Sequence, residues 1–379
     1  MIKVSHFNAS FSGGAAIASR QLSSSLIRSG INSELFYTSG PQSLDSNFRL
    51  NLSLVERAKN KIATGINFLI NDDPFFSLTS NSSAIKCIEN KAKTSIVHIH
   101  NFYNLLSARA LHSIMQKSQS IVLTAHDQRF ITGGCHYSLD CAGFKTGCLK
   151  CPIVPTLLSN KVKQNFDYVR KSRRVPIRLI APSRWLFDLM VHSLPNELFT
   201  FHHIENVLDY ESAKLETNRF RKGQIRIGFA AAQRHSFVKG TDIVNQIFRM
   251  SGIDSSYFRL LKPSHFNFDM DAFWNSIDIL FVPSRIDNQP NVIVEAHIRG
   301  IPVIASSVGG IPEQLFEGFD AGFQIEDLDA HSFSALVNRI ATRYSNESAL
   351  AVRNVVIERI DSALAQHIEL YGILSAHEA

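Results

Sequence analysis

Short runs of apolar residues alternate along this chain with segments whose apolar residues recur at helical spacing. Residues 2–7 form the first run, and residues 15–29 follow with apolar side chains at Ile17, Leu22 and Leu26 before Gly30 ends the pattern. Residues 34–37 then form a second apolar run. This order of strand, glycine-containing loop, helix and strand predicts a βαβ unit with parallel strands and a right-handed crossover.

The same cycle recurs to the end of the chain. Further strands are predicted at residues 95–100, 120–125, 177–181, 224–230, 277–283 and 301–306, and a helix over 291–299 ends at Gly300. Two successive halves of this kind predict an α/β protein with two Rossmann-like domains. We place the N-terminal domain at 1–205 and the C-terminal domain at 206–363, and expect a final helix at about 364–379 to pack back on the first domain.

Composition narrows the class of protein. Of the 379 residues, 45% are hydrophobic and 19% are charged, which indicates a core-forming chain rather than a disordered one. The sequence has no run of 18 apolar residues and no apolar segment of the signal-peptide type at its start, so we expect a cytoplasmic location. The net charge of +6 suits nucleic acid, anionic lipid or phosphorylated substrates and selects none of them.

Ligands of parallel sheets bind at the carboxyl ends of the strands, so the loops there are the candidate sites. Gly13 and Gly14 follow the first strand and offer backbone N–H groups to an anion, although a plain βα turn explains them as well. Arg234 and Lys239 lie on one later loop and suit a diphosphate, unless they are a solvated basic loop.

Two further loops carry carboxylates. Asp287 precedes a predicted helix that carries Glu295, and both suit sugar or ribose hydroxyls, although they also suit helix capping. Asn288, Pro290 and Asn291 would place polar groups at the start of that helix. The fourth loop contains Gly309, Gly310 and Glu313.

Taken in order, these motifs resemble the family-four retaining glycosyltransferases of the GT-B fold, in which two Rossmann-like domains face one cleft. The resemblance rests on Lys239-Gly240, Pro283-Ser284, the segment 287–296, Gly300-Ile-Pro and Gly309-Gly-Ile-Pro-Glu in the second half. In the first half it rests on Gly13-Gly14, His98-Ile-His100, Thr124-Ala-His126-Asp127 and Ala181-Pro-Ser. The segment from Phe130 to Pro152 is similar to transferases of bacterial exopolysaccharide, O-antigen and colanic acid assembly. The family's usual first acid is Glu, and here it is Asp287.

The resemblance implies a hexosyltransferase that uses a UDP- or GDP-linked sugar and needs no catalytic cofactor. It implies that Arg234 and Lys239 bind the diphosphate, that Asp287 contacts the donor sugar and that His126 lies near that sugar. It also implies that Glu295 holds the ribose, with Gly13, Gly14, Asn288, Pro290, Asn291, Gly309 and Gly310 as further donor contacts. The implied acceptor is a glycan or a lipid-diphosphate-linked glycan. An epimerase or phosphorylase on the same fold is the alternative enzyme, and a basic membrane- or nucleic-acid-binding protein is the non-enzymatic alternative.

Four of the five cysteines lie close together, at Cys135, Cys141, Cys148 and Cys151. Thiols stay reduced in the cytosol, so these residues suit a structural zinc site, with His136 as a spare ligand. A cysteine-rich loop packed without metal is the alternative. Two basic segments, 57–70 and 161–174, suit a peripheral contact with anionic membrane or an ordinary solvated helix face.

Overall fold

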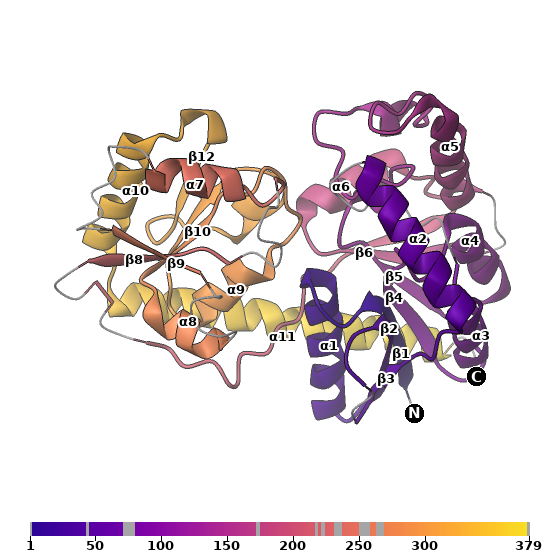
Figure 1. Cartoon of the computed structure of the whole chain (residues 1–379). Coiled ribbons are helices and arrows are strands. Elements are labelled where there is room, and N and C mark those ends of the chain that lie inside the picture. The colour runs from indigo at the N-terminus through magenta and orange to yellow at the C-terminus, as the bar shows by residue number, and fades with distance from the viewer. Residues whose placement is uncertain are drawn as a thin grey trace. The chain divides into compact units, whose positions relative to one another are not determined.

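The structure is a computed structural model that describes residues 2–42, 45–70, 80–171, 175–216, 219–220, 224–230, 237–249, 258–262 and 269–376. The chain forms two compact units (Figure 1). Unit 1 contains residues 1–207 and 363–379, and unit 2 contains residues 208–362. The long helix α11 (Asn346–Ala376) contributes to both units.

Unit 1 is built on a seven-stranded sheet whose strands all run parallel, in the order β3-β2-β1-β4-β5-β6-β7. Its strands are β1 (Lys3–Ser10), β2 (Asn32–Ser39), β3 (Asn47–Arg49), β4 (Ile96–Asn101), β5 (Ile121–Thr124), β6 (Ile177–Ala181) and β7 (Phe199–His203). Its helices are α1 (Gly14–Arg28), α2 (Leu54–Ile70), α3 (Ser82–Lys91), α4 (Ala108–Lys117), α5 (Thr156–Arg170) and α6 (Arg184–Ser193), with short 3-10 helices at Gln128–Phe130 and Gly143–Thr146.

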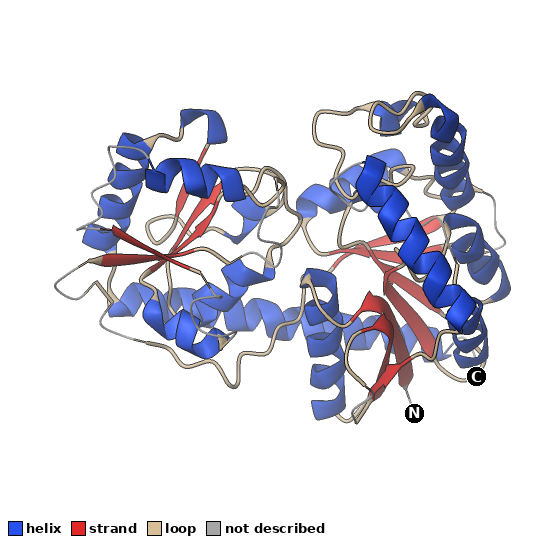
Figure 2. Cartoon of the chain, in the orientation of Figure 1, coloured by secondary structure: helices blue, strands red, loops and turns tan. Residues whose placement is uncertain are grey.

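Unit 2 is built on a second parallel sheet, with five strands in the order β12-β11-β10-β8-β9. Its strands are β8 (Ile225–Gly228), β9 (Phe258–Leu261), β10 (Ile279–Val282), β11 (Val303–Ser306) and β12 (Ala321–Phe323). Its helices are α7 (Thr241–Arg249), α8 (Met270–Ser276), α9 (Asn291–Ile298) and α10 (Ala330–Arg343), with 3-10 helices at Ile311–Gln314 and Ile325–Asp327. In each unit the helices pack around the sheet (Figure 2).

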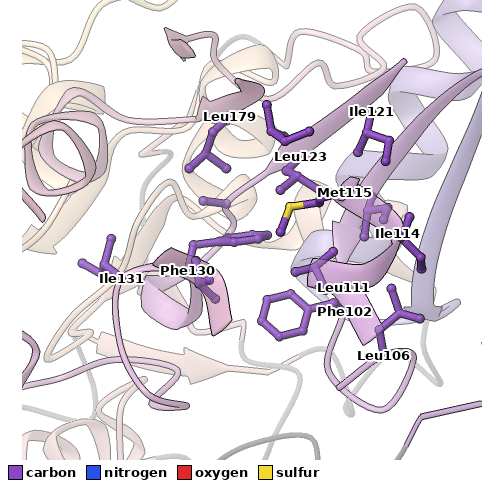
Figure 3. Close-up of a cluster of buried hydrophobic side chains, with 14 of the residues drawn as sticks. Phe102, Leu106, Leu111, Ile114, Met115, Ile121, Leu123, Phe130, Ile131 and Leu179 are labelled. Carbon is purple, nitrogen blue, oxygen red and sulfur yellow. The ribbon is translucent and has the colours of Figure 1, made fainter. Parts of the chain in front are cut away.

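Both faces of each sheet are buried, which is why the strands read as continuous apolar runs. In β10, Ile279 and Phe281 belong to one buried cluster, whereas Leu280 and Val282 belong to another on the opposite face. In unit 1 the side chains of β5, α4 and the loops beside them interlock in a single cluster around Met115 and Phe130 (Figure 3).

Local signals set the helix ends. Ser107 and Ser183 cap α4 and α6 through their side-chain oxygens, and Asp329 begins α10 with a capping box that includes Ser332. Gly30 follows α1 with a φ of 79°, a left-handed conformation that favours glycine. These caps fix where each helix starts, and hence which residues form the loops at the carboxyl ends of the strands.

Candidate active site

The strand order of unit 2 reverses between β8 and β10, and loops that follow such neighbouring strands diverge to leave a ligand crevice. Lys239 ends the loop after β8, and Asp287 lies on the loop after β10. The Lys239 ammonium donates to the Asp287 carboxylate at 2.5 Å. The Lys239 side chain is 37% exposed, whereas the Asp287 side chain is 7% exposed. A cation fixed by a buried acid at a topological switch point is suited to an anionic ligand.

Asp287 is a buried carboxylate that is held in place by several hydrogen bonds. Its carboxylate also accepts from the Ser284 hydroxyl at 3.4 Å and from the backbone N–H of Asn288 at 3.1 Å. These contacts fix the carboxylate and, through it, the Lys239 ammonium.

Two glycines allow the neighbouring loops to approach this pair closely. Gly309 has a φ of +59°, and a Cβ there would lie 2.0 Å from the carbonyl oxygen of Asp287. The N–H of Gly310 donates to that same carbonyl at 3.0 Å. Gly240 has a φ of +70°, and a Cβ there would lie 1.9 Å from the carbonyl oxygen of Pro283. Three of the four loops singled out from the sequence thus meet at one place, and glycine is required at both contacts.

The sequence did not single out Arg285, which anchors the Lys239 loop. Its guanidinium donates to both oxygens of Asp242, at 2.8 and 2.6 Å, and stacks 3.8 Å from the centre of the Phe237 ring. Its backbone N–H donates to the carbonyl of Val238. The sequence could have indicated Arg285 as a candidate, because it lies directly after Pro283-Ser284 at the end of a predicted strand. Arg234, the other predicted diphosphate ligand, lies outside the described residues.

Glu295 lies on α9, half-buried among apolar neighbours. Burial raises the pKa of its carboxyl to about 7, and the nearby Arg299 charge opposes this rise. Asn288, Pro290 and Asn291, the predicted contacts at the start of α9, are buried. Glu295 is therefore partly protonated at neutral pH, and a ligand that needs a carboxylate acceptor would favour its ionised form.

In unit 1, Gly13 and Gly14 begin α1. A Cβ added at either glycine would meet no heavy atom of the described residues within 4 Å, so a ligand can approach this backbone closely. His126 follows β5 and is half-buried, with its Nε2 3.2 Å from Nδ1 of His100. Burial lowers the pKa of His126 to about 4, so its imidazole is neutral.

The four predicted zinc ligands lie on one loop of unit 1. Burial raises the pKa of the Cys135 thiol, and the charges of Cys151, Cys148 and Cys141 add to this effect. Among the described residues, however, only His6, His98 and His100 bring three ligand atoms within 4.8 Å of one another. Zinc would therefore have to draw the sulfurs together. His136, the spare ligand, instead has its Nε2 3.4 Å from the Asp127 carboxylate.

The two basic segments, on α2 and α5, differ in the side chains that they expose to solvent. Among the helices that the structure describes, none is long and apolar enough to cross a membrane. On α2, Leu54, Val55 and Ile62 are 62–82% exposed, beside the exposed Arg57, Lys59 and Lys61. On α5, Arg170 does not belong to a solvated basic face, because its guanidinium donates to the carbonyls of Ile131 and Ser193. Arg173 and Arg174, which also belong to the predicted basic segment, lie outside the described residues.

The two parallel sheets, with a cation–carboxylate pair at the switch point of the second, define an α/β protein built from two Rossmann-like units. Comparison with known proteins gives its class. Residues 247–343 match the family model described as Glycosyl transferases group 1. The putative colanic acid biosynthesis glycosyl transferase WcaC of Escherichia coli (strain K12) is 24% identical over 341 residues, which cover 80% of this chain and 82% of that protein.

Solved structures of similar fold span the whole chain. Sucrose-phosphate synthase from Thermosynechococcus elongatus superposes with a TM-score of 0.66 at 12% identity and covers 100% of both chains. HepE of Anabaena in complex with UDP-glucose superposes with a TM-score of 0.63 at 13% identity, covering 98% of this chain and 100% of that one. The fold is therefore GT-B, as predicted. The chain carries a group 1 glycosyltransferase domain and is an enzyme of the glycosyltransferase class.

Proposed function

We propose that this protein is a retaining hexosyltransferase that moves a sugar from a UDP- or GDP-linked donor to a glycan or lipid-diphosphate-linked glycan in bacterial surface polysaccharide biosynthesis. The observation that carries the proposal is the Lys239–Asp287 pair at the switch point of unit 2. The similarity to WcaC, named for colanic acid biosynthesis, supports the acceptor class. The complex of HepE with UDP-glucose supports a nucleotide-sugar donor.

Lys239 would bind the donor diphosphate and stabilise the charge that develops on it as the glycosidic bond breaks. An ammonium has three N–H donors, so Lys239 can keep its bond to Asp287 while it binds a phosphate oxygen. Asp287 would therefore orient the Lys239 ammonium toward the diphosphate, in addition to its proposed contact with the donor sugar. Arg234 would supply a second positive charge, and Gly13 and Gly14 would let backbone N–H groups approach the phosphates.

Glu295 would accept hydrogen bonds from the ribose hydroxyls. Burial alone disfavours the carboxylate form, and two hydroxyl donors would stabilise it, so donor binding should be coupled to ionisation of Glu295. His126 would contact a sugar hydroxyl as a neutral imidazole. The other predicted donor contacts, Asn288, Pro290 and Asn291, would line the sugar side at the start of α9.

In the proposed reaction, the bond between the anomeric carbon and the diphosphate oxygen breaks. The acceptor oxygen then bonds to that carbon on the same face. The acceptor proton passes to the leaving diphosphate, so no protein nucleophile and no cofactor take part. We therefore assign Asp287 and Glu295 to binding rather than to the acid/base pair of a glycosidase.

The test compares purified Lys239→Ala and Glu295→Ala with Lys214→Ala and Glu317→Ala, which remove exposed charges elsewhere in unit 2. Transfer or hydrolysis of nucleotide sugars should fall by about 10²–10³-fold in Lys239→Ala, since it removes a group that stabilises the leaving charge. Glu295→Ala should raise KM for the donor, and both controls should keep wild-type rates. Unchanged activity in both site variants, with folding intact by circular dichroism, would refute the assignment.

We also propose that α2 makes a peripheral contact with anionic membrane, because its exposed apolar and basic residues combine the two properties that such binding needs. Vesicles of anionic lipid should sediment the wild-type protein better than vesicles of zwitterionic lipid. The double variant Val55→Ser/Ile62→Ser should lose this difference. Equal sedimentation of wild type and variant would contradict the contact.

A further inference from the structure

Unit 1 contains a cluster of imidazoles of which the proposed reaction uses only His126. It comprises His6 on β1, His98 and His100 on β4, His126 after β5 and His367 on α11, called here the histidine network. His6 and His98 face each other across the parallel pairing of β1 and β4. His6 and His98 are 0% exposed, and His100 and His367 are 3% exposed. Polar side chains buried so completely need partners, so their hydrogen bonds can be traced one by one.

Three of these rings form a continuous hydrogen-bonded chain. Nδ1 of His6 lies 2.9 Å from Nε2 of His100, and Nδ1 of His100 lies 3.2 Å from Nε2 of His126. His98 is held separately, because its Nδ1 pairs with the Tyr371 hydroxyl at 2.6 Å and its Nε2 with the Thr124 hydroxyl at 2.7 Å. The chain therefore runs from His6, inside the sheet, through His100 to His126.

All three rings of the chain are neutral. Burial lowers the pKa of His6 to about 3 and that of His126 to about 4, and it lowers the pKa of His100 well below its usual value with help from the neighbouring imidazoles. A neutral imidazole has one N–H donor and one acceptor nitrogen. The protons must therefore be ordered along the chain in one direction or the other.

The inner end of the chain selects the direction. Nε2 of His6 is buried and has no hydrogen-bond partner among the described residues. A buried N–H without an acceptor is rarer in proteins than an acceptor without a donor, so His6 carries its proton on Nδ1. His6 then donates from Nδ1 to Nε2 of His100, and His100 donates from Nδ1 to Nε2 of His126. His126 is left with its own proton on Nδ1.

A metal ion is the competing explanation, since ligand atoms of His6, His98 and His100 lie within 4.8 Å of one another. Two observations oppose it. Both nitrogens of His98 already pair with hydroxyl groups, and the facing nitrogens of His6 and His100 are at hydrogen-bonding distance. The set also holds no anionic ligand, so a dication would bring two uncompensated charges into a site that is 0–3% exposed.

We propose that His100, oriented by His6, is a positioning residue that holds His126 as the neutral Nδ1–H tautomer, so that His126 donates a hydrogen bond to a sugar oxygen. The inference rests on the proposed place of His126 beside the sugar. It specifies the chemistry of that contact: the substrate must offer an acceptor oxygen there, and a deoxy sugar would lose the bond. Fixing a tautomer through the second ring nitrogen is a general way of setting the role of a histidine.

The direct test needs no substitution. Protein labelled with ¹⁵N at histidine, at pH 7.5, should show one protonated and one unprotonated nitrogen for each network ring, with His126 protonated at Nδ1. A His126 signal protonated at Nε2, or averaged between the two tautomers, would overturn the proposal. So would stoichiometric metal bound to the network, measured by elemental analysis of wild type and His6→Phe.

A matched pair of variants tests the link to activity. His100→Leu removes the donor to His126, whereas His100→Asn places an amide N–H near the position of Nδ1. In His100→Leu, His126 should lose its single tautomer, and kcat should fall about 10- to 100-fold, by analogy with the loss of the hydrogen-bond partner of a metal-ligating histidine. His100→Asn should restore both. Equal loss in the two variants, with His126 still protonated at Nδ1, would contradict the positioning role. If both variants still bind the nucleotide sugar, such a result contradicts the positioning role alone and leaves the proposed function standing.

Discussion

Mild acid is expected to unfold unit 1, because the histidine network cannot take up protons while the unit is folded. Burial holds the pKa values of His6, His126 and His367 at about 3 to 4 and those of His98 and His100 well below the usual value of 6.5. The unfolded chain binds protons at these sites near pH 6.5. Stability from this source is therefore fully present above pH 6.5 and is lost as the pH falls toward 4.

The size of the effect follows from the number of rings. At pH 5.5, one unit below the unfolded pKa, protonation favours the unfolded state by about 1.4 kcal/mol for each imidazole. Five imidazoles give about 7 kcal/mol, which is comparable to the whole stability of a typical domain. Asp127 acts in the opposite direction, because burial raises its pKa, but a single carboxyl does not offset five imidazoles.

Trp185 lies in unit 1 and Trp274 in unit 2, so Trp274→Phe leaves a fluorescent probe of unit 1 alone. Urea unfolding of this variant should show a free energy about 7 kcal/mol lower at pH 5.5 than at pH 7.5, or no folded baseline at the lower pH. Adding His126→Asn should reduce the difference by about 1.4 kcal/mol. A difference below about 2 kcal/mol would refute the reasoning, because it would mean that the folded network binds protons readily.

Three further predictions concern the other sites. Gly309→Ala should weaken donor binding and lower stability by about 1–3 kcal/mol, because its Cβ would press on the carbonyl of Asp287. Gly318→Ala, which has a similar positive φ in open space, is the control, and equal effects would contradict the contact. Nucleotide affinity should rise from pH 6 to pH 8 as Glu295 ionises, and calorimetry should show no such rise in Glu295→Gln. Elemental analysis of purified protein should find zinc, at about one equivalent, on Cys135, Cys141, Cys148 and Cys151, and less than about 0.2 equivalents would exclude the site.

Much of the fold follows from local pattern. The apolar runs predicted the parallel strands because both faces of each sheet are buried, and the glycine- and proline-marked loops fell at the strand ends. The convergence of the loops that carry Lys239, Asp287 and Gly309 also follows, since carboxyl ends of parallel strands share one edge of a sheet. Short edge strands such as β3 (Asn47–Arg49) have too few residues to carry a pattern.

The specific side-chain pairings could be identified only from the three-dimensional structure. Lys239 and Asp287 are 48 residues apart, and His98 and Tyr371 are 273 residues apart, so spacing along the chain gives no sign of either contact. Arg170 belonged to a basic run, yet packing turned its guanidinium inward onto backbone carbonyls. A charge run shows only where charges are numerous, whereas tertiary contacts decide which of them face solvent.

Binding of a nucleotide-sugar donor at the switch point of unit 2 is the central claim, and calorimetric titration with a panel of UDP- and GDP-linked sugars tests it most directly. We expect the wild-type protein and Lys214→Ala to bind one nucleotide class, and Lys239→Ala to lose most of that affinity. Binding that is equal in Lys239→Ala, or no binding of any nucleotide sugar to the folded wild-type protein, would contradict the claim.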